Sequence, residues 1–178
     1  MIKSLVYVLI LYFMGSSSYM LFNFSKDRNI SAWKIVDDVV MGGRSNGSFK
    51  LNENGNGLFY GEISLKNNGG FSSVRYSFNK IDISAYTKVV LRIKGDGKEY
   101  QFRVKDDNSQ YYSFIKKFDT TGDWQTIEIP FEEMYPAFRG RKLNIQNFSS
   151  TTLAQIAFLI GNKKEEVFQL EIDQIYLQ

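Results

Sequence analysis

The 178-residue sequence predicts an all-β protein, a single jelly-roll β-sandwich that follows an N-terminal signal segment. From Leu58 onward, apolar and polar residues alternate in short runs that turn residues separate, which is typical of strands. Aromatic residues make up 16% of the chain, and flat rings pack well on a pleated, half-buried sheet. No window has the spacing of a long amphipathic helix, and the length suits one domain.

About eight strands are expected. In chain order they cover residues 58–65, 71–78, 89–94, 100–105, 111–118, 124–129, 153–160 and 168–173. Gly95-Asp96-Gly97 is a tight hairpin signal, and Pro130 ends the sixth strand because proline cannot donate to a ladder. Residues 131–150 are weakly patterned and are expected to form a long loop, a kind of segment that often carries function. The side chains that we expect in the core of the sandwich are Trp33, Val89, Leu91, Ile93, Phe102, Trp124, Leu170 and Ile172.

The run 36–45 combines two adjacent carboxylates, a glycine pair, an arginine and a serine. The three consecutive apolar residues 39–41 within it are expected to be held against a core, so that the polar side chains point out of a fixed turn. Two interpretations follow from the residues. The polar side chains bind a ligand or partner, or an internal Asp–Arg pair holds the turn together.

The composition excludes several kinds of chemistry. The chain has no His and no Cys, which excludes Ser-His-Asp triads, thiol nucleophiles, disulfides and zinc sites built on those ligands. Bound metal would need oxygen ligands. The net charge is +3 without a block of five like charges, so neither a nucleic-acid arm nor a polybasic membrane patch is indicated. The sequence therefore predicts no cofactor and no nucleic-acid partner, and it assigns no metal site.

Residues 1–18 have the pattern of a secretory signal. Lys3 supplies the positive charge, 5–14 is an unbroken apolar run, and 15–18 are small residues that suit cleavage after Ser18. Ten apolar residues reach only about half the thickness of a bilayer core, so a permanent span is disfavoured. We expect an exported protein, periplasmic or secreted, with a folded domain at 20–178. The alternative is an uncleaved signal anchor.

Several segments together resemble the complex I intermediate-associated protein 30 family, and the resemblance covers about residues 20–178. In chain order the matching segments are Trp33 with Asp38-Val39-Val40-Met41-Gly42-Gly43-Arg44-Ser45, then Phe59-Tyr60-Gly61, Gly69-Gly70-Phe71-Ser72-Ser73-Val74-Arg75, Gly95-Asp96-Gly97 with Tyr100, Trp124, Ile129-Pro130-Phe131, Arg139-Gly140 and Leu170-Glu171-Ile172-Asp173-Gln174-Ile175. Each motif alone is weak, but their shared order is specific.

This resemblance implies a galactose-binding-like β-sandwich, a fold shared with many carbohydrate-binding modules. It also implies a non-catalytic role, because the mitochondrial members are assembly factors for respiratory complex I. The expected export signal distinguishes this chain from the mitochondrial members. The resemblance therefore predicts the fold more firmly than it predicts the function. We therefore expect a non-catalytic binding module of the cell envelope that recognises a protein partner or a glycan. The candidate binding residues, which lie in the shared motifs, are Asp38, Arg44, Arg75, Asp96 and Tyr100. Alternatively, these charges form an internal ion network.

Two other functions stay open. A carbohydrate-binding module would need aromatic platforms beside amide groups, and the candidates are Tyr111, Tyr112, Trp124, Tyr135 and Phe138 with Asn108 and Gln110. A carboxylate glycosidase would have to use the doublets 37–38 or 132–133, although adjacent strand residues point to opposite faces. Galactose-binding-like domains often hold a structural calcium. Here its candidate ligands are Asp173 and Asp37 or Asp38, unless Asp173 merely faces solvent.

Overall fold

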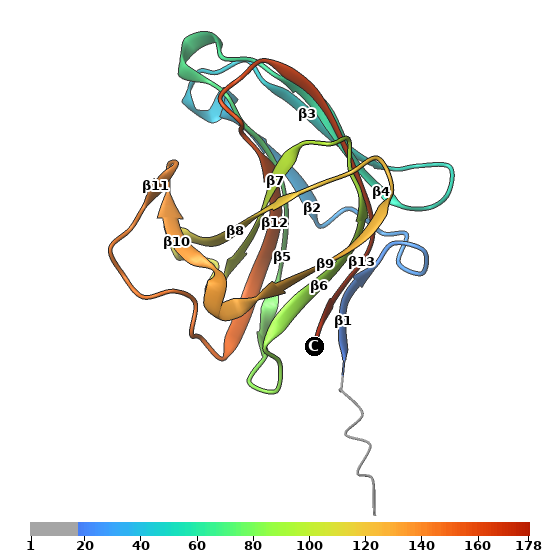
Figure 1. The fold of residues 1–178 in the computed structure, drawn as a ribbon, viewed down its shortest axis with the longest axis vertical. Coiled ribbons are helices and arrows are strands. Elements are labelled where there is room, and N and C mark those ends of the chain that lie inside the picture. The colour runs from blue at the N-terminus through green and yellow to red at the C-terminus, as the bar shows by residue number, and fades with distance from the viewer. Residues whose placement is uncertain (1–17) are drawn as a thin grey trace, which may run out of the picture.

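The computed structural model describes residues 18–178, which fold into two antiparallel sheets packed face to face (Figure 1). Apart from Ser18, the expected signal segment lies outside the described residues. Strands account for most of the described chain, and the three helices are short 3-10 turns. These are η1 (Asp38–Met41), η2 (Lys66–Asn68) and η3 (Phe131–Glu133).

One sheet, which we call sheet A, has the strand order β3-β4-β13-β6-β9. Its strands are β3 (Asn46–Leu51), β4 (Gly57–Ile63), β6 (Lys88–Lys94), β9 (Trp124–Pro130) and β13 (Glu166–Leu177), with β1 (Tyr19–Asn23). The C-terminal strand β13 is its centre, since it pairs with β6 on one side and with β4 and then β1 on the other. The first and last described strands therefore lie side by side.

The opposite sheet, sheet B, has the order β11-β10-β8-β7-β12-β5-β2. Its strands are β2 (Trp33–Asp37), β5 (Ser72–Asp82), β7 (Glu99–Lys105), β8 (Ser113–Asp119), β10 (Tyr135–Phe138), β11 (Arg141–Lys142) and β12 (Thr152–Ile160). All eight strands expected from the sequence are present. The strands it missed are β1, β2, β3, β10 and β11, which have six residues or fewer and so show little alternation. Residues 131–150 are not one loop, because they contain η3, β10 and β11.

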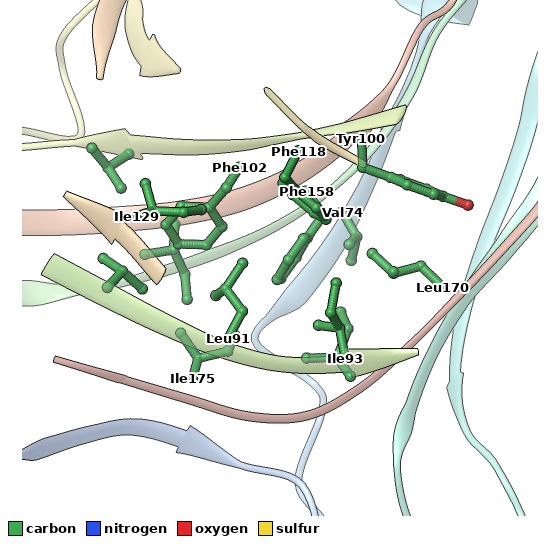
Figure 2. Close-up of a cluster of buried hydrophobic side chains, with 14 of the residues drawn as sticks. Val74, Leu91, Ile93, Tyr100, Phe102, Phe118, Ile129, Phe158, Leu170 and Ile175 are labelled. Atoms are coloured by element: carbon green, nitrogen blue, oxygen red, sulfur yellow. The ribbon is translucent and has the colours of Figure 1, made fainter. Parts of the chain in front are cut away.

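The core fills the space between the sheets. Figure 2 shows Leu91 of β6 and Leu170 of β13 opposite Phe102 and Phe158 of sheet B, whose rings are 5.3 Å apart. All four side chains are fully buried. Seven of the eight residues that the sequence assigned to the core are buried in the structure. These are Trp33, Val89, Leu91, Ile93, Phe102, Leu170 and Ile172.

The assignment of Trp124 to the core was wrong. Trp124 begins β9 and is 36% exposed, whereas Ile129 near the end of the same strand is 1% exposed. Side chains alternate between faces, so residues five apart on one strand point in opposite directions. The indole ring therefore lies on the outer face of sheet A, where the Arg92 guanidinium is 5.3 Å from its centroid.

Candidate functional site

Asp38 is a fully buried carboxylate that holds two loops together. It opens η1 and accepts hydrogen bonds from the backbone N–H groups of Ser45 (2.9 Å), Gly70 (2.6 Å) and Phe71 (3.2 Å), and from the Ser45 hydroxyl. These donors come from the loop after η1 and from the turn before β5. Two of the motifs that carry the family resemblance thus meet at one carboxylate.

The amide groups compensate the cost of burying this charge. Burial raises the pKa of Asp38, but the hydrogen bonds from Ser45, Gly70 and Phe71 outweigh it, and the net pKa lies below its ordinary value. Glycine is required around the carboxylate, because a Cβ on Gly43 would lie 2.3 Å from one carboxylate oxygen of Asp38. A Cβ on Gly69 would lie 2.6 Å from the other. Both carboxylate oxygens of Asp38 thus accept hydrogen bonds from within the protein. We call this carboxylate and its donors the Asp38 lock, because they hold the two loops together.

Asp96 and Tyr100 form a second internal lock. The buried Tyr100 hydroxyl donates to Asp96 (3.0 Å), whose other oxygen accepts from Lys98 Nζ (2.7 Å) and the backbone N–H of Gln169 (2.9 Å). Burial raises the pKa of Tyr100, and the neighbouring Asp96 charge raises it further. The pair fastens the β6–β7 hairpin to β13. The Tyr100 side chain is buried, and both carboxylate oxygens of Asp96 accept hydrogen bonds within the protein.

Arg44 is exposed after η1, and within residues 18–178 no carboxylate pairs with it. The internal Asp–Arg pair considered from the sequence is therefore absent there, and backbone amides with Ser45 hold Asp38 instead. The expectation for residues 39–41 was also wrong. Val39, Val40 and Met41 are 60%, 73% and 50% exposed, because the 3-10 turn directs only Asp38 inward.

Arg75 belongs to a different surface, the outer face of sheet B. Val74 and Phe102 point into the core (Figure 2), so Arg75 and Arg103, the next residues along β5 and β7, point outward. Both arginines pair in register with Ala157 of β12 between them. Lys105 lies two residues after Arg103 on the same face. We call Arg75, Arg103 and Lys105 the cationic face.

These three cations are close enough to perturb one another. Burial and then the Arg75 charge lower the pKa of Arg103, Tyr135 opposes the change, and the net pKa is about 10. Burial and then the two arginine charges lower the pKa of Lys105. Burial also lowers the pKa of Arg75. No ion pair involves any of the three among the described residues.

The polar groups around the cationic face are incompletely satisfied. Arg75 Nε donates to Ser73 Oγ (3.2 Å), and Lys105 Nζ donates to the carbonyl of Gln110 (2.6 Å). In contrast, Arg103 Nε and the side-chain carbonyl oxygens of Gln101 and Gln110 are buried without a hydrogen-bond partner in the described structure. Natural structures rarely leave buried polar atoms unpaired, and their usual partners outside the protein are bound water, ions or ligands.

Aromatic side chains border this face. Tyr135 of β10 continues the row of Arg103 through Ile115 of β8. Tyr111 follows Gln110, is 65% exposed, and its ring lies 5.2 Å from that of Phe138. The sequence pointed to Arg75, Tyr111, Tyr135 and Gln110 separately. It missed Arg103, Lys105 and Gln101, although the alternation in 100–105 could have indicated that they share an outward face.

On the outer face of sheet A, by contrast, cations pair with carboxylates of neighbouring strands. Arg92 Nε pairs with Asp173 (3.1 Å), and Lys88 Nζ pairs with Glu128 (2.7 Å). Cations are thus neutralised by neighbouring strands on sheet A, while the cationic face of sheet B has no such neutralisation in the described residues.

The carboxylates considered for calcium do not converge. Ile63 pairs with Glu166 and Gly57 with Ile172, so Ser64, beside the Asp38 lock, and Asp173 lie at opposite ends of the β4–β13 pair. Asp37 accepts from the Gly47 N–H (3.0 Å) and the Ser72 hydroxyl (2.6 Å). Within residues 18–178 there is no group of three or more His, Cys, Asp or Glu that could hold a metal ion. No helix in that part of the chain is long and apolar enough to cross a membrane.

Solved structures with the same fold include carbohydrate-binding modules. A family 11 carbohydrate-binding module from Clostridium thermocellum, in complex with a β-1,3-1,4-mixed-linked tetrasaccharide, matches with a TM-score of 0.64 and 22% identity over 90% of this chain and 94% of that one. An exo-β-agarase matches with a TM-score of 0.59 and 16% identity, over 92% of this chain but 25% of the enzyme. At these identities the likeness shows the fold, an all-β sandwich of two antiparallel sheets.

Sequence comparison identifies relatives and a family. The mouse protein "Complex I intermediate-associated protein 30, mitochondrial" is 25% identical over 175 residues, covering 85% of this chain and 53% of that protein. The Drosophila melanogaster protein of the same name is 24% identical over 194 residues, covering 95% and 66%. The chain thus spans between about half and two thirds of these relatives. The model of Complex I intermediate-associated protein 30 (CIA30) matches residues 22–172, and the chain belongs to this family.

Proposed function

We propose that this chain is an exported, non-catalytic binding module that recognises a protein partner or a glycan in the cell envelope, through the outer face of sheet B. The observation that carries the proposal is the cationic face itself. Three neighbouring cations without acidic partners, together with unpaired buried polar atoms on Gln101, Arg103 and Gln110, destabilise an isolated domain. A bound target that supplies the missing partners accounts for them.

The relatives support a binding role. Two are named as proteins associated with an assembly intermediate, and a protein of the same fold holds a tetrasaccharide. Export is supported by the pattern of residues 1–18, and β1 begins at Tyr19, directly after the expected cleavage point. Removal of the signal would leave every described strand intact.

A different observation favours a protein partner at a second surface. Val39, Val40 and Met41 of η1 are exposed, and Leu65 is 41% exposed before η2. Asn67 Nδ2 donates to the Gly42 carbonyl (3.1 Å), which joins the η2 turn to the end of η1. We call these four apolar side chains the apolar tip. Exposed apolar groups that lie together are typical of protein contacts.

The two surfaces can be separated with paired variants of the full-length protein in its own host. The face variant is Arg75→Gln with Arg103→Gln, and the tip variant is Val39→Ser with Val40→Ser. Envelope extracts are passed over each immobilised protein, captured proteins are identified by mass spectrometry, and binding to insoluble polysaccharides is measured by depletion. We expect the wild type and the tip variant to capture the same target, and the face variant to lose it. Loss in the tip variant alone would move the site to the apolar tip, and no specific capture in either assay would refute the binding role.

A further inference from the structure

We propose that the cationic face binds an acidic polysaccharide, whose carboxylate or sulfate groups pair with Arg75, Arg103 and Lys105 while its hydroxyl groups satisfy Gln101 and Gln110. This inference rests on the proposed function, since it takes the outer face of sheet B as the binding surface. Beyond the proposed function, it specifies the chemical class of the ligand, an acidic polysaccharide.

The charge of the face selects an anion. Arg103 Nε is buried and lacks a partner in the described structure. The two arginines flank the small side chain of Ala157, and the Arg75 charge is near enough to lower the pKa of Arg103. An anion placed between them removes their repulsion and satisfies the unpaired Nε. A planar guanidinium also matches a carboxylate or sulfate group in bidentate geometry. A neutral sugar would leave the repulsion in place.

The sheet also sets a spacing. Arg75, Arg103 and Tyr135 lie in one row across the strands, each two strands from the next. Adjacent strands lie about 4.8 Å apart, so the positions repeat roughly every 9.6 Å along the row. A straight, extended polymer that lies across the strands can place an anionic group at each arginine and a sugar ring at Tyr135.

The unpaired acceptors distinguish a polysaccharide from an acidic protein segment. Gln101 and Gln110 present buried carbonyl oxygens, which need donors, beside cations, which need an anion. An acidic sugar supplies both, as ring hydroxyls and a carboxylate. Exposed Tyr111 adds an aromatic surface on which a sugar ring can stack. Moreover, β5, β12, β7 and β8 are paired on both sides, so no strand edge is open here for a peptide to extend the sheet.

The test uses the mature protein and three probes: polygalacturonate, which carries carboxylates, dextran sulfate, which carries sulfates, and neutral mixed-linkage β-glucan. Binding is measured by calorimetry and by retardation in polymer-containing native gels, at low and moderate salt. The face variant is Arg75→Gln with Arg103→Gln. The matched control is Lys26→Gln with Lys50→Gln, which removes the same charge from two exposed positions on or beside sheet A. Arg103→Lys keeps the charge but not the planar fork.

We expect an acidic polymer to bind the wild type and the control variant alike, with affinity that falls as salt rises. The face variant should bind at least ten times more weakly, and Arg103→Lys should be intermediate. Thermal melting of each variant checks that it is folded. Preference for one acidic probe identifies the anionic group.

Three results would overturn the inference. If the control variant lost as much affinity for the acidic polymers, binding would depend on the overall charge of the protein and not on the cationic face. If neutral β-glucan bound as tightly as the acidic polymers, the protein would be a glycan-binding module without selectivity for acidic groups. If it bound an envelope protein but no polysaccharide, it would be a protein-binding module. The proposed function survives the last two results. It fails only when neither polysaccharide nor envelope protein is bound.

Discussion

The backbone N–H of Gly70 donates a 2.6 Å hydrogen bond to the carboxylate of Asp38, which lies 32 residues earlier in the chain. This contact fixes η1 against the turn before β5, and Ser45 and Phe71 complete it. The segments that identify the family at this point are therefore structural. They set the shape of one end of the sandwich, while the unsatisfied charges lie on the outer face of sheet B.

Removal of the Asp38 carboxylate should strongly destabilise the fold. Asp38→Ala leaves the N–H groups of Ser45, Gly70 and Phe71 without their acceptor in a buried site. Each unpaired buried group costs about 1–3 kcal/mol, so we expect the free energy of unfolding to fall by about 3 kcal/mol or more. Urea unfolding measures it. Glu53→Ala, at an exposed carboxylate, is the control, and a similar small loss in both variants would contradict the lock.

The same lock predicts a pH dependence. The hydrogen bonds lower the pKa of folded Asp38 below that of the unfolded chain, so its contribution to stability is present above about pH 4. The contribution is lost as the pH falls through the lowered folded value. We expect the stability difference between wild type and Asp38→Asn to be constant from pH 7 to 5 and to shrink below pH 4. A difference that stays unchanged down to pH 3 would show that the carboxylate charge is not involved.

Gly43 tests the steric part of the lock. A Cβ at Gly43 would lie 2.3 Å from Asp38 Oδ1, whereas a Cβ at Gly122 would meet nothing within 4 Å. Neither glycine has a left-handed backbone, so the two alanine variants differ in space alone. We expect Gly43→Ala to cost about 1–3 kcal/mol or more and Gly122→Ala to change stability by less than about 0.5 kcal/mol. Equal effects in thermal or urea unfolding would mean that the carboxylate moves freely.

The two tryptophans should differ in the same assay. Trp33 is 5% exposed and stacks on Tyr76 at 5.0 Å, so Trp33→Ala should cost about 3–5 kcal/mol. Trp124 is partly exposed and loses chiefly its contact with Arg92, so Trp124→Ala should cost about 1 kcal/mol or less. If Trp124→Ala lowered the free energy of unfolding as much as Trp33→Ala, the Trp124 ring would have to be buried in the core.

Export is tested at the N-terminus. Because residues 1–18 have the pattern of a signal, N-terminal sequencing of protein isolated from the envelope or medium should begin at Tyr19, within a few residues. An intact Met1 on membrane-bound protein would favour the signal anchor. An intact Met1 on soluble cytoplasmic protein would refute export.

The sequence by itself determined the strand pattern and the chemical limits of the protein. Alternation in 100–105 placed Phe102 inside, and Gly95-Asp96-Gly97 marked the turn between β6 and β7. Alternation is a local property with a period of two, so it survives without knowledge of partners. The assignment of Trp124 to the core failed because it followed the apolar character of the ring, whereas alternation with Ile129 places the ring outward. Alternation also missed the shortest strands, which offer too few residues to establish a period.

Only the tertiary structure decided which charged residues are used internally and which remain available. Asp38 and Arg75 stand in neighbouring motifs and look alike as candidates, yet one is enclosed by amides and the other faces outward. The cationic face exists because β12 pairs with both β5 and β7 and brings Arg75 and Arg103 to either side of Ala157. Strand register sets such neighbours. It arises from hydrogen bonds between residues far apart in the chain, which local patterning does not encode.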